Sequence, residues 1–449
     1  MKPKVLLATT CCWFPTARLG MALANAGCEV EAVCPSGHPL SRTSAVHQTH
    51  AYSGLAPLGS FAAAIAAAQP DMIVPGDDLA TWHLQSLYRQ EQGSARKASA
   101  KQDPTKTGTI SALIEHSLGA AESFPVVYSR SDFMALAHAE GIRAPQAEVI
   151  LDVEHLRTWV SGTGFPTVLK ANGTSGGDGV RIVHSVKEAE AAFRRLQAPP
   201  LLARAAKRAL IDQDKTLVWP SLLRRHSAVS AQAFIAGHEA TSTICCWKGS
   251  VLASLHFEVV KKASAAGHAT VVRLIENAEM AAAAEKITRK LGLSGFYGFD
   301  FMIEAGTGNA YIIEVNPRAT QVGHLNLGPG RDLPAALYAA LSGKAAQPAP
   351  KVTEKDTIAL FPQEWIRDPE SVYLRSAYHD VPWNEAELMR DCVNSRRKQS
   401  AWYSRAARTS AAVPLPGPTA VAAKTDAVEQ AWGKKSSFKP AILESNTNR

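Results

Sequence analysis

The sequence predicts a mixed fold, with a parallel α/β unit at the N-terminus and antiparallel sheets in the middle of the chain. Over residues 1–75, short apolar strands alternate with helical segments, which is the order of a parallel sheet with crossover helices. Further on, strand-like runs at 165–171 and 180–183, and again at 298–304 and 311–316, are separated by turns rich in glycine, as in antiparallel hairpins. A chain of 449 residues has room for about two to three domains.

The N-terminal unit is expected to have strands at 4–10, 29–34 and 71–75 and helices at 15–26 and 61–69. A parallel sheet binds ligands beyond the carboxyl ends of its strands. Four polar residues fall at this edge: Thr9, Thr10, Asp77 and Asp78. Turn and helix-cap chemistry also explains these four residues, and it is the interpretation that we favour from the sequence.

A glycine-rich loop joins the two runs at 165–171 and 180–183. Glycines let backbone N–H groups approach a polyphosphate closely. The loop is not a Walker A motif, because no Gly-Lys-Ser/Thr follows it, and it lacks the G-x-G-x-x-G dinucleotide pattern. A lysine at the end of the first run strengthens the case for phosphate binding. The residues concerned are Lys170, Gly173, Ser175, Gly176, Gly177 and Gly179.

The second hairpin would bring two carboxylates and an amide to one face. If its turn is centred on Thr307, Asp300 opposes Glu314 and Asn316 lies on the same side. The opposite face would be apolar, with the pairs Phe299–Val315, Phe301–Ile313 and Ile303–Tyr311. Opposed like charges destabilise a sheet, so a cation is expected there, and three oxygen ligands suit Mg²⁺. From the hairpin alone, the solvated face of an ordinary hairpin is an equally good interpretation.

Taken together, these segments resemble the ATP-grasp superfamily over about residues 126–343. The resemblance implies a pre-ATP-grasp α/β domain at 1–125 that contributes to substrate binding. It also implies a two-lobed ATP-grasp domain at 126–345, with a mobile glycine-rich lid at about 150–230. A small extension is expected at 346–395, and a basic tail, largely disordered by composition, at 396–449.

The resemblance assigns roles to particular residues. Lys170 and Arg318 would be catalytic, and Asp300, Glu314 and Asn316 would hold the metal. Arg130 stands where family members usually carry a first lysine; it keeps the charge but differs in geometry. The segment 232–239 looks like the hinge that reads adenine and ribose. The nucleotide-binding residues would be Arg130, Lys170, Gly173, Ser175, Gly176, Gly177, Gly179, Gln232, Phe234, Ile235 and Glu239.

The function implied is an ADP-forming carbon–nitrogen ligase that uses ATP and Mg²⁺, or Mn²⁺ in its place, to join a small carboxylic acid to an amine. Two alternatives stay open: a bicarbonate-activating carboxylase or carbamoyl-phosphate-type enzyme, and a nucleotide-binding regulatory protein without turnover. The sequence shows no biotin-attachment Met-Lys-Met and no second ATP-grasp half. A homodimer is compatible with all three.

Composition excludes several other classes. Hydrophobic and charged contents of 46% and 20% are ordinary for a globular protein, and no apolar run reaches the ~20 residues of a membrane span. The net charge of +8 comes without a basic stripe interleaved with aromatics, so a nucleotide substrate explains it better than a nucleic acid. Seven cysteines without C-x-x-C spacing, and no signal-peptide layout, predict a cytoplasmic protein with reduced thiols.

Several polar residues near the expected site are candidates by position alone. Exposed loop polarity or helix capping explains them equally well. They are His268, Arg273, Gln321, His324 and Asn326.

Overall fold

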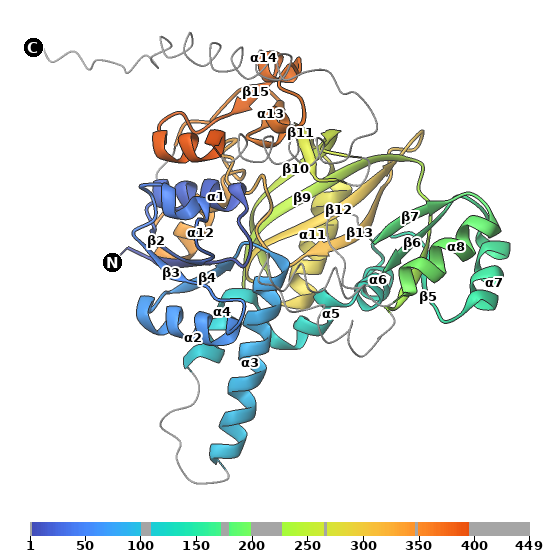
Figure 1. The fold of residues 1–449 in the computed structure, drawn as a ribbon, viewed down its shortest axis with the longest axis horizontal. Coiled ribbons are helices and arrows are strands. Elements are labelled where there is room, and N and C mark those ends of the chain that lie inside the picture. Colours follow the sequence, from blue (N-terminus) through green and yellow to red (C-terminus); the bar gives the residue numbers. More distant parts are fainter. Residues whose placement is uncertain are drawn as a thin grey trace, which may run out of the picture.

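The computed structural model describes residues 2–99, 109–171, 179–198, 227–264, 267–345 and 349–394 (Figure 1). Within these ranges the strands form three sheets, and a mixed α/β architecture with one parallel and two mainly antiparallel sheets confirms the predicted fold class. In Figure 1 the parallel sheet and the smaller antiparallel sheet lie on opposite sides of the large central sheet.

The first sheet is parallel and has the strand order β3-β2-β1-β4. Its strands are β1 (Lys4–Ala8), β2 (Glu29–Cys34), β3 (Gln48–Ala51) and β4 (Met72–Pro75). Its helices are α1 (Phe14–Asn25), the 3₁₀ turn η1 (Pro39–Arg42), α2 (Pro57–Ala68) and α3 (Asp78–Ser99). The predicted strands and helices are confirmed, with small shifts of their ends. Strand β3 was not predicted, because an edge strand of exposed polar residues has no apolar alternation.

A helical connection follows, and its last helix opens beside the site described below. It consists of α4 (Thr109–Leu118), the 3₁₀ turn η2 (Ala121–Ser123), α5 (Phe124–Tyr128) and α6 (Arg130–Ala139). The Ser129 side chain accepts a hydrogen bond from the Asp132 amide and so caps the N-terminus of α6. This cap fixes where the helix begins, and Arg130 is its first residue.

The small sheet is antiparallel, with the order β5-β8-β6-β7. It contains β5 (Ala147–Ile150), β6 (Thr167–Ala171), β7 (Val180–Val183) and β8 (Val229–Ala233), covered by α7 (Val153–Thr163) and α8 (Val186–Gln197). Asp152 and Ser185 cap the two helices. The sheet has a small apolar core of its own, which includes Leu156, Leu169 and Phe193.

The large sheet has the order β13-β12-β9-β10-β11-β14-β15 and is antiparallel except for the pair β14–β15. Its strands are β9 (Gly237–Trp247), β10 (Ser250–Lys262), β11 (Ala269–Leu274), β12 (Gly295–Glu304), β13 (Ala310–Asn316), β14 (Thr357–Leu360) and β15 (Tyr378–Asp380). The accompanying helices are α11 (Ala278–Leu291), α12 (Leu333–Ser342), α13 (Gln363–Arg367) and α14 (Tyr373–Ser376). One apolar cluster runs from Leu19 and Met72 in the first unit to Phe257 and Val272 in this sheet.

The two C-terminal strands change how the expected extension is understood. We predicted a small separate element at 346–395, but β14 pairs with β11 and therefore continues the large sheet. The boundary at 345 would divide residues of a single sheet. The expected tail at 396–449 lies outside the described residues. No helix in the described ranges combines the length and apolar content needed to span a bilayer.

Candidate functional site

The predicted carboxylate hairpin is formed by β12 and β13. Asp300 pairs with Glu314 and Gly298 with Asn316, so the three predicted metal ligands share one face. The apolar register is only partly as predicted. Phe299 opposes Val315, but Phe301 opposes Ile312 rather than Ile313. Ile313 is an extra residue, a β-bulge directly beside Glu314, and it shifts every pair nearer the turn by one.

Asp300 sits in an electrostatically unfavourable position. Burial and the neighbouring Glu314 carboxylate raise the pKa of Asp300 to about 6, although hydrogen bonds from Asn316 and Thr241 oppose the rise. The Asn316 Nδ2 donates to Asp300 Oδ2 at 2.9 Å. Within the described residues the second oxygen of Glu314 accepts no hydrogen bond. Two like charges therefore face each other with acceptor capacity left over.

Two cations from other elements approach this pair. Arg130, at the start of α6, donates from Nη2 to Glu314 Oε1 at 2.8 Å and from Nη1 to the Ala171 carbonyl at 3.4 Å. Lys170, at the end of β6, is buried with 5% exposure. Burial lowers the pKa of Lys170 to about 8, and the Arg130 charge adds to the effect, while Glu314 and Asp300 oppose it. The structure thus brings the predicted phosphate-binding cations onto the hairpin.

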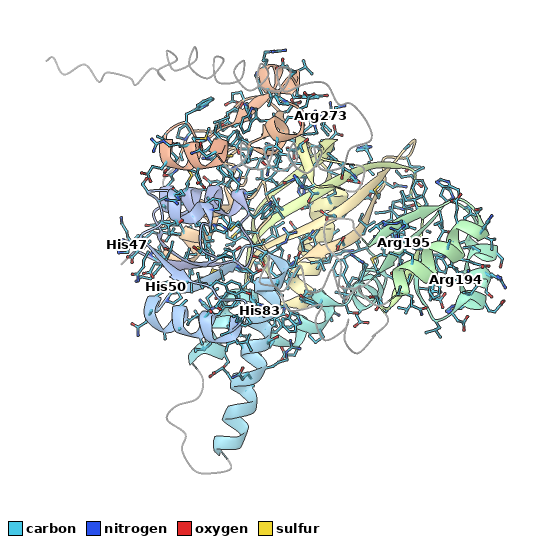
Figure 2. The ribbon with its side chains drawn as sticks, viewed as in Figure 1. His47, His50, His83, Arg194, Arg195 and Arg273 are labelled. Carbon is cyan, nitrogen blue, oxygen red and sulfur yellow. The ribbon has the colours of Figure 1, made fainter. Side chains whose placement is uncertain are left out.

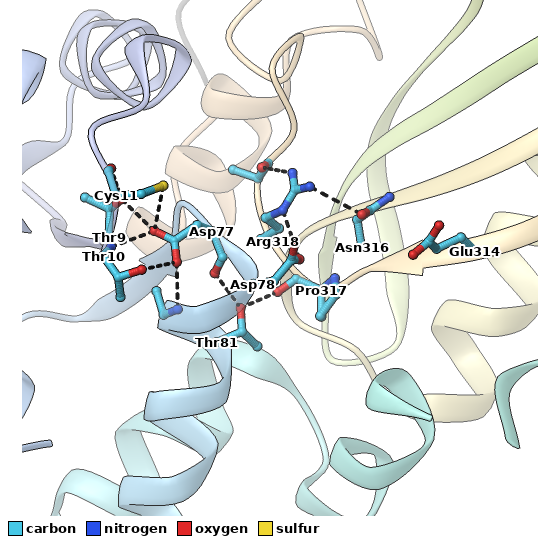
Figure 3. A network of polar contacts seen from close by, with 12 residues as sticks. Thr9, Thr10, Cys11, Asp77, Asp78, Thr81, Glu314, Asn316, Pro317 and Arg318 are labelled. Atoms are coloured by element: carbon cyan, nitrogen blue, oxygen red, sulfur yellow. Dashed lines mark hydrogen bonds and ion pairs between the residues drawn. The ribbon is translucent and has the colours of Figure 1, made fainter. Parts of the chain in front are cut away.

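Arg318 is held between the hairpin and the first unit (Figure 3). Its Nε donates to Asp78 Oδ1 at 3.0 Å, Nη1 to the Ala319 carbonyl at 3.2 Å and Nη2 to Asn316 Oδ1 at 3.3 Å. The guanidinium also lies over the Trp13 ring, 5.4 Å from its centroid. Burial by itself would lower the pKa of Arg318, but the Asp78, Asp300 and Asp77 carboxylates outweigh it and raise the pKa.

The segment after β13 docks on the carboxyl edge of the first sheet. Thr81 Oγ1 donates to the Pro317 carbonyl at 2.8 Å, and the Ala319 amide to the Pro75 carbonyl at 3.1 Å. In the order β3-β2-β1-β4, β2 and β3 are added on one side of β1 and β4 on the other, so the direction in which strands are added reverses between β1 and β4 while all strands stay parallel. Open α/β sheets bind ligands at such switch points. The Arg318 side chain lies at this edge.

The four polar residues expected at this edge divide into two groups. Asp77 accepts from Thr9 Oγ1 at 2.7 Å, the Thr10 amide at 2.6 Å, Thr10 Oγ1 at 2.8 Å and the Ala80 amide at 2.8 Å. Turn and cap chemistry therefore accounts for Thr9, Thr10 and Asp77, as we favoured. Asp78 is different because it contacts Arg318. The Trp13 contact was missed; its only sequence signal is a tryptophan just beyond the first strand.

The predicted hinge links the small sheet to the large one. Gln232 is buried in β8, between Ala147 and Val168 of the neighbouring strands. Phe234 and Ile235 are half-buried in the short connection between β8 and β9. Glu239, the predicted ribose-binding acid, accepts from Lys262 Nζ at 2.7 Å. Of the predicted glycine-rich loop, Gly179 precedes β7, whereas Gly173, Ser175, Gly176 and Gly177 lie outside the described residues.

Four of the five residues that were candidates by position alone make structural contacts. Gln321 Nε2 donates to the Ala269 carbonyl at 3.0 Å, and Asn326 Oδ1 accepts from the Gly328 amide at 3.0 Å. None of them caps α12, which begins after Asp332. Arg273 forms an ion pair with Glu258. For His268 the structure assigns no side-chain partner within the described residues.

His324 belongs to a buried network that fastens the C-terminal strands to the first unit. Its Nε2 lies 2.6 Å from Asp380 Oδ2, and Arg18 of α1 pairs with the same carboxylate. Arg18 and His324 outweigh burial and lower the pKa of Asp380 to about 2. The network is largely buried, with the Asp380 side chain 1% and the Arg18 side chain 12% exposed, and a structural role accounts for it.

The donor set on the hairpin fits Mg²⁺. It comprises two carboxylates and an amide oxygen, all hard ligands, with unused acceptor capacity and a repulsion that a divalent cation would relieve. No group of three His, Cys, Asp or Glu side chains is placed to hold a metal anywhere in the described residues, and the hairpin set reaches three ligands only with the Asn316 amide. The seven cysteines are all free thiols; Cys28, Cys34, Cys245 and Cys246 are buried, while Cys11 and Cys12 are exposed.

Comparison with known sequences gives two matches. The ATP-grasp domain family model matches residues 210–322, a range that includes the hinge and the hairpin. The arginine-specific large chain of carbamoyl phosphate synthase from Geobacillus stearothermophilus is 27% identical over 201 residues, which are 43% of this chain. The match spans only 16% of that much longer relative.

Solved structures with the same architecture include three nucleotide-bound enzymes. The N5-carboxyaminoimidazole synthetase from Staphylococcus aureus, complexed with ADP, has a TM-score of 0.50 and 13% identity over 78% of this chain and 80% of that one. The biotin carboxylase domain dimer of Hydrogenobacter thermophilus 2-oxoglutarate carboxylase, with MgADP, ADP and bicarbonate, has a TM-score of 0.50 and 15% identity over 77% and 70%. The Campylobacter jejuni biotin carboxylase, in its β,γ-ATP complex, has a TM-score of 0.50 and 14% identity over 77% and 72%.

At these identities the structural likeness establishes the fold alone. It agrees with the sequence match and with the hairpin, hinge and small sheet described above. The resemblance seen in the sequence is confirmed where the comparisons reach: residues 210–322 match the ATP-grasp domain model, and the solved structures share the fold.

Proposed function

We propose that this protein is an ADP-forming ligase that activates a carboxylic acid as an acyl phosphate and joins it to an amine. The observation that carries the proposal is the β12–β13 hairpin, where Asp300 and Glu314 oppose each other beside Asn316. Arg318 follows two residues later, with two of its five N–H donors unused within the described residues. That free fork suits a carboxylate or a phosphoryl group.

Each charged side chain has a role in this proposal. Asp300, Glu314 and Asn316 would hold Mg²⁺, which when bound neutralises the β- and γ-phosphates of ATP. Arg130 and Lys170 approach from α6 and β6 and would contact the same phosphates. ATP binding would replace the contact between Arg130 and Glu314 with contacts to phosphate and metal. The hinge around Phe234 and Ile235 would place the adenine between the two antiparallel sheets.

The chemistry needs no protein nucleophile. A carboxylate oxygen of the acid attacks the γ-phosphorus, the bond to the β-phosphate oxygen breaks, and ADP leaves. The amine then attacks the acyl carbon, inorganic phosphate leaves, and the amine loses a proton as the amide forms. Rate enhancement comes from orientation and from positive charge fixed around the transferring group.

Bicarbonate activation is the second candidate. Two comparisons favour it: the curated relative is a carbamoyl phosphate synthase chain, and the Hydrogenobacter thermophilus biotin carboxylase domain was solved with a bicarbonate anion. The free fork of Arg318 suits bicarbonate as well as a larger carboxylate. In that case ATP would convert bicarbonate to carboxyphosphate with release of ADP, and an amine would displace phosphate to give an N-carboxylated amine.

The test is a screen for ADP release. Purified protein receives MgATP with pools of carboxylic acids, with or without pooled amines, and separately with bicarbonate. The ligase proposal predicts acid-dependent ADP release, a hydroxamate when hydroxylamine is added, and loss of both in Arg318→Ala. A matched control is Glu276→Gln, which removes the ion-pair partner of Arg331, a pair that lies outside the proposed set of site residues.

The outcomes separate the candidates. ADP release that depends on bicarbonate and on no other acid would transfer the assignment to the second candidate. Nucleotide binding without ADP release under any condition would indicate a regulatory protein. ADP accompanied by a phosphorylated alcohol or amine, without hydroxamate, would contradict both ligase proposals and indicate a kinase.

A further inference from the structure

Asp77 and Asp78 are adjacent carboxylates at the edge of the first sheet, and they have different partners. Asp77 is saturated by Thr9, Thr10 and the Ala80 amide. It thereby fixes the loop that follows β1 and leads to Trp13. Asp78 makes no contact of that kind: its Oδ1 accepts from Arg318 Nε, a residue 240 positions away in the sequence. Its side chain is 37% exposed.

The first unit thus holds Arg318 from two directions, of which Figure 3 shows the contact with Asp78. Asp78 fixes the Nε edge at 3.0 Å, and the Trp13 ring covers one face with its centroid 5.4 Å from the guanidinium carbon. Asn316 and the Ala319 carbonyl take one donor each from the two terminal nitrogens. Contacts outside the hairpin as well as within it therefore set the plane of the guanidinium and the direction of its two N–H groups that are unused within the described residues, one on Nη1 and one on Nη2.

The residue after Trp13 connects the loop that carries Trp13 to the C-terminal strands. Phe14, the next residue, packs edge-on against Phe361 with ring centroids 5.4 Å apart. Phe361 directly follows β14, which belongs to the large sheet. The Trp13 position therefore depends on the seating of the first unit against the large sheet. This arrangement couples the docking of the two parts to the orientation of one side chain.

We propose that Asp78, assisted by Trp13, is a positioning residue for Arg318, so that the acid-activating site is complete only when the first unit is docked. The inference rests on the proposed function for the meaning of Arg318, but the contact itself can be tested separately. A guanidinium held on one edge and one face presents a fork of fixed direction, and small misplacements of a catalytic group slow a reaction strongly.

The first test measures the reactivity of Arg318 without any substrate. Phenylglyoxal modifies arginine side chains, and peptide mass spectrometry gives the rate at each one. Arg195, exposed on α8 beside the small sheet (Figure 2), is the internal reference. We expect modification of Arg318 to be several-fold faster in Asp78→Asn than in the wild type. In Glu276→Gln the rate should rise at Arg331 and stay unchanged at Arg318.

The second test uses turnover with whichever acid, or bicarbonate, supports ADP release. Asp78→Asn should lower kcat by about tenfold or more, with the KM for MgATP within about twofold of the wild type. Asp78→Glu should restore part of the loss, because it restores the charged acceptor. Trp13→Phe should have a smaller effect than Trp13→Ala. A merely structural role of Asp78 would instead lower the melting temperature and leave kcat per folded molecule unchanged.

The two measurements fail in distinguishable ways. If no acid and no bicarbonate releases ADP from the wild-type protein, the proposed function fails, and the labelling still decides whether Asp78 holds Arg318. If Asp78→Asn leaves the Arg318 labelling rate and kcat at wild-type values, the positioning role is wrong while the ligase proposal stands. Faster labelling of Arg318 with unchanged kcat would also overturn the positioning role.

Discussion

The edge of the first sheet and the β12–β13 hairpin both carry clustered acidic side chains, but the two regions differ in how far hydrogen bonds satisfy the carboxylate oxygens. Asp77 accepts four N–H or O–H hydrogen bonds at 2.6 to 2.8 Å and one from the Cys11 thiol at 3.8 Å, all from groups of its own unit. On the hairpin, Asp300 faces Glu314, and the pKa of Asp300 rises to about 6 because burial and a like charge act together. The first carboxylate is satisfied by the fold, and the second pair is not.

This difference separates structural from functional acids more sharply than residue type does. A carboxylate whose partners come from the surrounding backbone and hydroxyls stabilises the turn it closes. Opposed carboxylates with acceptor capacity left over cost stability, so they indicate a ligand that the folded chain does not itself supply. Substitutions in the two regions should therefore have opposite consequences for folding and for turnover.

The largest effect is expected on turnover from Glu314→Gln. This change removes a proposed metal ligand's charge with little change of volume, so ADP release should fall by about a hundredfold or more. The fold should be retained, because Glu314 is partly exposed and is bonded through one oxygen to Arg130. Steady-state kinetics across a Mg²⁺ titration, together with circular dichroism, provide the check. Near-normal turnover of Glu314→Gln at limiting Mg²⁺ would contradict the role of the hairpin carboxylates as metal ligands.

Asp77→Ala should have the next largest effect, and on stability. The substitution removes the hydrogen-bond acceptor of the buried Thr10 and Ala80 amides and of the Thr9 and Thr10 hydroxyls. A loss of about 2–4 kcal/mol in the free energy of unfolding is expected. Urea denaturation measures it, and Asp77→Asn should show a smaller loss because one acceptor oxygen remains. If Asp77→Ala unfolds at the wild-type urea concentration, the edge carboxylate is not the structural element described here.

Lys170→Met should weaken nucleotide binding while sparing the fold. Lys170 is buried, and burial holds its pKa near 8, so methionine removes an unfavourable desolvation along with the charge. The dissociation constant for a non-hydrolysable Mg-ATP analogue should rise by about tenfold, because a charged contact to phosphate is lost. Calorimetric titration measures it, with Lys286→Met on the exposed face of α11 as the control. Unchanged affinity would place the phosphates away from β6.

The smallest effect concerns the metal-free protein and its pH dependence. A folded pKa of about 6 for Asp300 lies above the ordinary value of 3.8, so between these pH values the folded state binds more protons than the unfolded state. Stability from this group is therefore present at low pH and is lost as the pH rises through 6. Asp300→Asn should stabilise the metal-free protein by about 1 kcal/mol at pH 7 and by nothing near pH 4. Equal effects at both pH values would contradict the repulsion.

Much of the hairpin could be predicted because its information is local. Alternation of apolar and polar residues around one turn fixed the shared face of Asp300, Glu314 and Asn316. The bulge at Ile313 could not be predicted, because two consecutive isoleucines are equally compatible with either register. The strands of the first sheet followed from apolar runs, whereas β3 is polar and carries no such pattern.

Contacts between distant segments were beyond the reach of local patterns. Nothing near Asp78 indicates that it meets Arg318, and nothing near Thr357 indicates that β14 pairs with β11. Strand pairing of this kind depends on which edge is left open once the other strands are placed. The cations were predicted to lie near the hairpin only through the family resemblance, since Arg130 and Lys170 belong to different elements.

The central claim, that the hairpin carboxylates bind the metal of a metal–nucleotide complex, is tested most directly with Mn²⁺ as a paramagnetic substitute for Mg²⁺. Electron paramagnetic resonance would count bound Mn²⁺ in the presence of a non-hydrolysable ATP analogue for the wild type, Glu314→Gln and Asp77→Asn. We predict tight nucleotide-dependent binding in the wild type and in Asp77→Asn, and binding weakened by about tenfold or more in Glu314→Gln. Equal Mn²⁺ binding by the wild type and Glu314→Gln would contradict the assignment of this site.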